Sequence, residues 1–187
     1  MVSVLDSVGL ISREGTVLVI IDVQEKLFPL IAEKEIVSKN LQKLIKFAQI
    51  VKMPIVLTEQ YPKGLGRTIP EIKKLIPNVN PIEKVEFNCF GSEEFQNILQ
   101  RLEAKTLILT GIETHICVSQ TAIDGLRRYR VGVISDAVSS RRLEDKEIGL
   151  ERMKQSGVII LSTEMFIYEI LKRAGTAEFK EALKLVK

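Results

Sequence analysis

The sequence of 187 residues contains no tryptophan, one histidine and two cysteines. Aromatic residues make up only 5% of the chain, which argues against a surface on which nucleic-acid bases stack. One histidine and two cysteines are too few ligands for an ordinary zinc site, and we expect no metal. Two cysteines also form no disulfide framework, so we expect free thiols in a reducing, cytoplasmic compartment.

Dense charge and long apolar runs are scarce as well. The net charge is only +3, and Arg127-Arg128 and Arg141-Arg142 are isolated basic pairs, so we expect no nucleic-acid partner. No apolar stretch is long enough to cross a bilayer, and we expect no membrane partner. The N-terminal residues Met1–Asp6 lack the basic region and apolar run of a signal peptide.

The chain contains short apolar runs that alternate with amphipathic segments. Thr16–Ile21 is apolar on both faces, as in a strand of a parallel sheet that helices cover on both sides. Alternation of this kind implies right-handed βαβ units. We therefore predict one domain spanning residues 1–187, an α/β fold with a three-layer α/β/α sandwich and a six-stranded parallel sheet. The six expected strands cover residues 16–21, 54–58, 82–87, 106–110, 131–135 and 157–161.

Helical periodicity fills the intervals between the expected strands. Between Glu33 and Val51, apolar residues recur every three or four positions and form one helical face. Ser92 is expected to cap the helix that follows it. The other expected helices cover residues 69–76, from the turn at Gly111 to about 129, 143–155, 163–171 and 177–185.

One stretch, Thr106–Val118, combines a buried strand, a sharp turn at Gly111 and a helix with Cys117 in its first turn. The unpaired N–H groups and the dipole at a helix start favour a thiolate and can hold an oxyanion. A cysteine that only packs the helix on the sheet fits this stretch equally well. His115 is two residues away and faces elsewhere on a helix, so we expect a surface or interface residue there.

Polar residues follow several expected strands at the sheet edge where ligands bind in open α/β folds. They are Asp22, the segment Glu59-Gln60-Tyr61, Lys84, Cys117 and Asp136, and each alone could merely brace a loop. Together they suggest a nucleophilic site, because a carboxylate can take the thiol proton and Lys84 can stabilise the charges. Spacing alone does not decide between Asp22 and Asp136 as the acid.

A nucleotide site is not indicated. No G-x-G-x-x-G pattern follows the first strand, which ends in Asp22-Val23-Gln24. Gly64-Leu65-Gly66 has no helix-opening context, and no P-loop pattern is present. We therefore expect no cofactor. Cys89 is expected to be a core residue and not a second nucleophile.

The segments Ile20–Gln24, Glu83–Phe87 and Gly111–Val118 resemble the isochorismatase-like cysteine hydrolases, in the same order along the chain. Thr58–Gly66 and Ser135–Arg141 resemble loops of the isochorismatase-domain-containing subgroup. The resemblance covers nearly the whole chain. It implies the Rossmann-like fold of that superfamily and assembly into a homo-oligomer, a dimer, tetramer or larger.

The resemblance also implies site roles. It makes Asp22, Lys84 and Cys117 a catalytic triad and so favours Asp22 over Asp136. It implies a cis peptide bond between Ile112 and Glu113, with the N–H groups of Glu113 and Cys117 forming an oxyanion hole. We expect the substrate pocket to be lined by polar and aromatic residues near these positions, namely Gln24, Phe28, Glu59, Tyr61, Phe87 and Phe90.

Departures from the pattern narrow the chemistry. The nicotinamidase branch carries an acidic residue and several histidines after the second strand, where this chain has Glu59-Gln60-Tyr61. Nicotinamide is therefore a poor substrate candidate. Isochorismatases that act on isochorismate replace the cysteine by a small residue, whereas Cys117 is present here. Isochorismate is therefore a poor substrate candidate as well.

The resulting hypothesis is a metal-independent cysteine hydrolase that cleaves a small amide or related C–N bond through a thioester. The alternative is a catalytically weak oligomeric scaffold or thiol-sensing protein on the same fold. Thiol reactivity distinguishes the two, because an activated Cys117 should alkylate much faster than Cys89.

Overall fold

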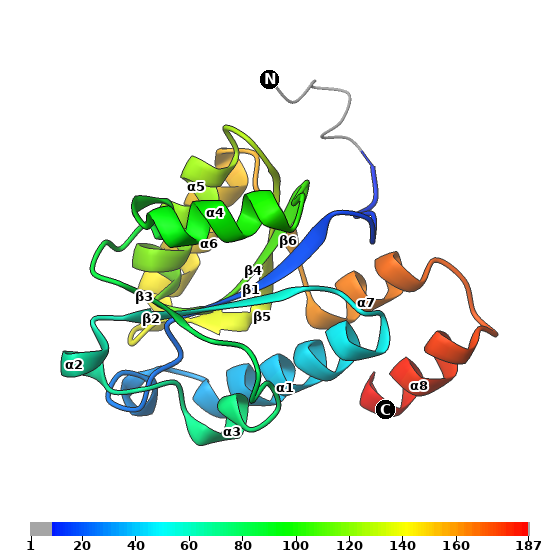
Figure 1. Ribbon diagram of the computed structural model, residues 1–187, viewed down its shortest axis with the longest axis horizontal. Coiled ribbons are helices and arrows are strands. Elements are labelled where there is room, and N and C mark those ends of the chain that lie inside the picture. The colour runs from blue at the N-terminus through cyan, green and yellow to red at the C-terminus, as the bar shows by residue number, and fades with distance from the viewer. Residues whose placement is uncertain (1–8, 187) are drawn as a thin grey trace.

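The computed structural model describes residues 9–186, so the segment Met1–Asp6 lies outside the described residues. Its centre is a six-stranded sheet in the order β3-β2-β1-β4-β5-β6, and all five pairings are parallel (Figure 1). This confirms the predicted six-stranded parallel sheet. The strands are β1 (Thr16–Ile21), β2 (Ile55–Gln60), β3 (Ile82–Lys84), β4 (Thr106–Ile112), β5 (Arg130–Ser139) and β6 (Ile159–Leu161).

Helices cover both faces of the sheet, which confirms the three-layer sandwich. In Figure 1, α4, α5 and α6 lie above the sheet, while α1, α3, α7 and α8 lie below it. Two buried clusters fill the spaces between the layers, one around Phe47 and Phe166 and one around Phe95 and Met153. The helices are α1 (Lys34–Ile50), α2 (Pro62–Leu65), α3 (Pro70–Lys73), α4 (Glu93–Arg101), α5 (Ser119–Gly125), α6 (Leu143–Gln155), α7 (Thr163–Leu171) and α8 (Ala177–Val186).

The strand order reverses between β1 and β4, which is where a parallel sheet opens a crevice at its carboxyl edge. In the register, Ile21 of β1 lies between Thr58 of β2 and Gly111 of β4. The residues that immediately follow these positions therefore meet at one edge. This topology places Asp22 and the segment carrying Cys117 beside each other.

The structure differs from the predicted elements at several places. β4 runs through Gly111 to Ile112, so the sharp turn predicted at Gly111 is wrong. β6 begins at Ile159 and α3 covers only Pro70–Lys73, so both are shorter than predicted. β3 ends at Lys84 instead of continuing to Phe87. β5 continues to Ser139, because the register with β4 shifts between Leu109 and Gly111 and extra residues of β5 are accommodated there. β2 continues to Gln60, and the segment that follows it contains α2. The helix after β4 begins with a π-helical turn, η4 (Thr114–Val118), and α5 ends at Gly125, not near residue 129.

Within residues 9–186, no helix has the length and apolar character needed to cross a membrane. Ser92 caps α4 as predicted, since its hydroxyl accepts a hydrogen bond from the N–H of Phe95 at 3.3 Å.

Candidate active site

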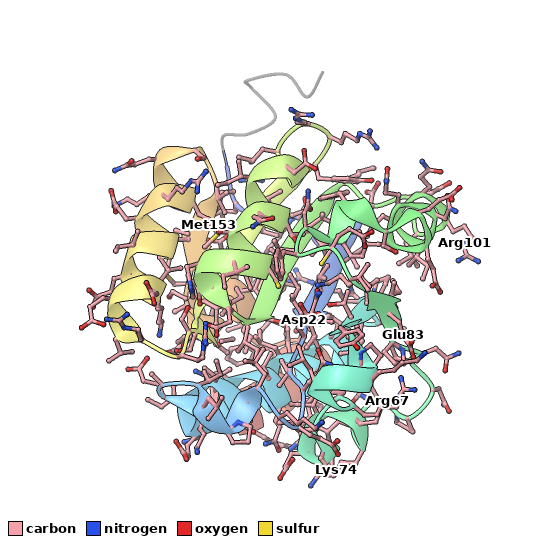
Figure 2. The ribbon with its side chains drawn as sticks, turned by 90° about the vertical axis from the view of Figure 1, so that its left-hand side faces the viewer. Asp22, Arg67, Lys74, Glu83, Arg101 and Met153 are labelled. Carbon is pink, nitrogen blue, oxygen red and sulfur yellow. The ribbon has the colours of Figure 1, made fainter. Side chains whose placement is uncertain are left out.

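A buried ion pair lies at the carboxyl edge of the sheet. Asp22 follows β1 in a left-handed conformation, with φ of 55°, and Lys84 is the last residue of β3. The Lys84 Nζ atom lies 2.7 Å from Asp22 Oδ2, and the two side chains are 0% and 1% exposed. Figure 2 shows Asp22 in the interior, between the two helical layers. Such burial requires each charge to be paired, because an isolated buried charge costs several kcal/mol or more.

Residues of β2 complete the surroundings of this pair. Thr58 donates its hydroxyl to Asp22 Oδ1 at 2.7 Å, and Gln60 Oε1 accepts a hydrogen bond from Lys84 Nζ at 2.7 Å. The two side chains lie on the same face of β2 because side chains two residues apart point the same way. The sequence placed Gln60 in the polar segment at this edge but gave it no role of its own, and the signal available was this alternation continued beyond the expected end of the strand.

Cys117 reaches the ion pair from η4, the turn that follows β4. A Cβ atom on Gly111 would clash with the backbone of Ile21, so only glycine, here at φ of 103°, lets β4 approach β1 this closely. Cys117 is 6% exposed, and the Asp22 carboxylate is close enough to its thiol to raise the thiol's pKa. The structure thus brings together Asp22, Lys84 and Cys117.

The pKa of the Cys117 thiol is set by burial and by two charged neighbours. Burial and the negative charge of Asp22 raise this pKa above its usual range, and the Lys84 cation offsets only part of the rise. The upward shift opposes the stabilisation of a thiolate that was expected at a helix start. Burial lowers the pKa of Lys84, but the negative charge of Asp22 and the neighbouring thiols outweigh it, and the net shift is upward.

The second cysteine, Cys89, is a buried core residue, as predicted. Its side chain is fully buried, and burial raises the pKa of the thiol to about 11. Both cysteines are free thiols, as predicted. The N–H of Cys89 donates to the hydroxyl of Thr121, one helical turn after Cys117.

The peptide bond between Ile112 and Glu113 is cis. Among residues 9–186, no hydrogen-bond acceptor is found for the Glu113 N–H. The Glu113 carboxylate binds Arg141, because it accepts hydrogen bonds from the backbone N–H and from the Nε of Arg141 at 3.1 and 2.5 Å. His115 Nδ1 lies 2.9 Å from the hydroxyl of Ser140, so the histidine is engaged there and not with the thiol.

Two polar residues expected in the pocket wall are buried and hydrogen-bonded to other parts of the protein. Gln24 is fully buried, and its amide is hydrogen-bonded to the backbone of Gln60 and Gly66. The buried Glu59 accepts hydrogen bonds from the N–H and hydroxyl of Thr68, both at 2.7 Å. Glu59 points to the opposite face of β2 from Thr58 and Gln60, since adjacent strand residues alternate.

The four aromatic residues expected near the pocket lie in different environments. Phe28 packs against the buried cluster around Phe47 and Phe166, and Phe90 packs against Phe95 and Tyr129. Tyr61 and Phe87 are both 54% exposed. The N–H of Tyr61 donates to the carbonyl of Lys84 at 2.8 Å, and the two residues line the same cavity.

Asp136, the alternative acid, has a structural role. Its Oδ1 accepts hydrogen bonds from the N–H and the hydroxyl of Thr163, both at 2.8 Å, at the start of α7. The part of the chain that the structure describes contains no group of three or more His, Cys, Asp or Glu side chains placed to hold a metal ion.

The fold and the site together define the class of this protein. It is a Rossmann-like α/β sandwich with an acid, a lysine and a cysteine at the carboxyl ends of its strands. Comparison with known proteins gives the family: residues 16–165 match the family model described as Isochorismatase domain. The chain belongs to the isochorismatase family, as the sequence resemblance indicated.

Individual relatives support the same assignment. Isochorismatase domain-containing protein 2A of mouse is 36% identical over 182 residues, which cover 97% of this chain and 87% of the mouse protein. The structure of MAR1 ribonuclease from Caenorhabditis elegans superposes with a TM-score of 0.89 at 34% identity, covering 95% of this chain and 92% of that one. YcaC of Escherichia coli, an octameric hydrolase of unknown specificity, shares the fold at 21% identity with a TM-score of 0.87, covering 94% of this chain and 90% of that one.

Proposed function

We propose that the protein is a metal-independent cysteine hydrolase that cleaves a small amide or related C–N bond through a thioester intermediate. The observation that carries this proposal is the burial of Cys117 beside the Asp22–Lys84 ion pair, whose charged atoms lie 2.7 Å apart and both influence the pKa of the thiol. Membership of the isochorismatase family supports hydrolysis as the general reaction.

In the first half of the reaction, Asp22 is the general base. The raised pKa of Cys117 means that the thiol is protonated at rest and gives up its proton only as sulfur attacks. Asp22 accepts this proton while Cys117 Sγ forms a bond to the substrate carbonyl carbon. Thr58 and Lys84 hold the two carboxylate oxygens in place during the transfer.

The carbonyl oxygen of the substrate becomes an oxyanion, for which we propose the N–H groups of Glu113 and Cys117 as donors. The unpaired N–H of Glu113 supports this role. An oxyanion-hole donor of this kind contributes about 10²–10³-fold in rate in other acyl-transfer enzymes.

In the second half, the C–N bond breaks and Asp22 returns its proton to the leaving nitrogen, leaving an acyl group on Cys117. Water then attacks the thioester, Asp22 accepts a proton from the water, and the acid product leaves as the C–S bond breaks. The proton on Asp22 passes to the Cys117 sulfur. One water is consumed, and thiol and carboxylate return to their starting states.

A second candidate function is a weakly catalytic scaffold or thiol-sensing protein, because one observation favours it. Cys117 is only 6% exposed and its pKa is raised, so its resting reactivity toward substrates is low. One structural neighbour, YcaC of Escherichia coli, is described as an octamer, which supports our proposal of a homo-oligomer in either case. Size-exclusion chromatography with light scattering tests that assembly.

The two free cysteines support our proposal of a reducing, cytoplasmic location.

The experiment that tests catalysis is a turnover screen of small amides, ureides and a short RNA, the last because one structural relative is named as a ribonuclease. Wild type is compared with Cys117→Ala and with Cys89→Ala as the matched control. Amide turnover lost only in Cys117→Ala supports the hydrolase. RNA cleavage that survives Cys117→Ala, or no turnover at all, contradicts it.

A further inference from the structure

The ammonium group of Lys84 has three N–H donors, and the structure accounts for all of them. Lys84 Nζ donates to Asp22 Oδ2 at 2.7 Å, to Gln60 Oε1 at 2.7 Å, and to the carbonyls of Glu86 at 3.2 Å and Phe87 at 3.5 Å. Two of these four acceptors are side chains, and only Asp22 belongs to the triad. No donor is left for a substrate, so Lys84 is held as a fixed cation.

Gln60 is itself fixed at every polar group. Its Nε2 donates to the carbonyl of Val85 at 2.7 Å, which ties it to the residue after Lys84. Its backbone N–H donates to Gln24 Oε1 at 2.7 Å, and its carbonyl accepts from Gln24 Nε2 at 3.0 Å. Gln60 therefore joins the side chain and the following backbone of Lys84 to the end of β2.

The side chain of Gln24 forms the backbone hydrogen bonds that a neighbouring strand would form. The backbone of β1 turns away at Asp22, where φ is 55°, and leaves the end of β2 without a strand partner on that side. The Gln24 amide supplies one acceptor and one donor to the backbone of Gln60, the pattern by which a strand residue pairs. This explains why β2 and its ladder with Lys84 extend to the site.

We propose that Gln60 is a positioning residue that fixes the Lys84 ammonium against Asp22, and that Gln24 fixes Gln60. The catalytic consequence rests on the proposed function, but the positioning itself does not. A neutral acceptor is the side chain the site requires, because a carboxylate at residue 60 would compete with Asp22 for the same cation. An apolar side chain would leave a buried N–H donor of the ammonium unpaired.

The reactivity of Cys117 measures this positioning without any substrate. The Lys84 cation favours the thiolate, so a displaced Lys84 lowers the thiolate fraction at a given pH. Alkylation by iodoacetamide is followed by peptide mass mapping between pH 7 and 10, which reads Cys117 and Cys89 separately. The variants are Gln60→Leu and Gln60→Glu, with Gln96→Leu as the control, since Gln96 likewise donates its amide to a backbone carbonyl but lies on α4.

We expect both Gln60 variants to alkylate Cys117 about tenfold more slowly at each pH, which corresponds to a rise of one pKa unit. Gln96→Leu should match wild type. Gln60→Glu preserves the shape of the side chain, so it gives a result even where Gln60→Leu does not fold. A lower Tm with an unchanged alkylation profile in the folded variants would show a merely structural role and overturn the proposal.

The outcome is separable from that of the proposed function. Wild type without turnover but with the predicted Gln60 effect on alkylation rejects the hydrolase and retains the positioning. Turnover in wild type with unaffected kcat and alkylation in both Gln60 variants retains the hydrolase and rejects the positioning.

Discussion

Lys84 Nζ and Asp22 Oδ2 lie 2.7 Å apart, although 62 residues separate them in the chain and both side chains are almost fully buried. The pair joins β3, the strand at one edge of the sheet, to the end of the central strand β1. Burial makes the two charges depend on each other, and several measurable properties follow from this dependence.

Removing one member of the pair should destabilise the fold strongly. Lys84→Met leaves the Asp22 carboxylate buried without its cation, and we expect a loss of about 3–5 kcal/mol in the free energy of unfolding. The double variant Asp22→Asn/Lys84→Met should recover most of this loss in urea denaturation. Lys105→Met, which breaks the exposed pair with Glu14, is the control and should change little. Equal losses in the single and double variants would contradict the dependence.

The hydroxyl of Thr58 should matter beyond its packing. Thr58→Val keeps the shape but removes the donor to Asp22 Oδ1, a hydrogen bond to a charged group worth about 1.5–3 kcal/mol. Thr110→Val is the control, because Thr110 donates only to the neutral carbonyl of Val19. Denaturation should show the larger loss for Thr58→Val, and any turnover should fall only in that variant. The reverse order would count against an ionised Asp22.

Gly111 should tolerate no side chain. Gly111→Ala places a Cβ atom against the Ile21 backbone, so β1 and β4 must separate and we expect failure to fold or a Tm too low to purify the variant. Gly157 also has a positive φ, of 101°, but faces open space, and Gly157→Ala should cost only about 1 kcal/mol. Thermal unfolding of the two variants measures this difference. Similar losses of Tm in both would show that the contact with Ile21 is unimportant.

Stability should fall in alkaline solution because the native state keeps buried thiols protonated. The pKa of Cys89 rises from 9.0 to about 11, so between those values the unfolded chain binds fewer protons and folding loses about 1.4 kcal/mol per pH unit for this thiol. Cys117, whose pKa is also raised, adds to the loss in the same direction. Urea denaturation from pH 8 to 11 should show a shallower decline for Cys89→Ala. Identical slopes would contradict a protonated Cys89.

Much of this site could be predicted from residue patterns. The alternation of apolar strands and amphipathic helices gives the sheet, and parallel strands place the residues after them at one edge. That is enough to name Asp22, Lys84 and Cys117 as neighbours. The choice of Asp22 over Asp136 required the family resemblance, since the bulge that keeps Asp136 inside β5 and beside Thr163 depends on pairing between strands.

Other features depend on contacts distant in sequence and could not be predicted. Gln60 is a site residue because the Gln24 amide extends β2 past Thr58, where the apolar run ends. The raised pKa of Cys117 depends on how deeply the thiol is buried, which a helix-start argument does not include. A local sequence pattern therefore predicts which residues form the site, but not how burial shifts the pKa of the thiol.

The central claim is that Cys117 forms and then hydrolyses an acyl adduct, and time-resolved intact-mass spectrometry with an amide from the screen tests it most directly. We predict an adduct of acyl mass on wild type that decays in water to the unmodified protein. Cys117→Ala should show none, and Lys84→Met should form the adduct more slowly. An adduct that persists, that appears equally on Cys117→Ala, or that no amide or thiol electrophile produces would contradict the hydrolase.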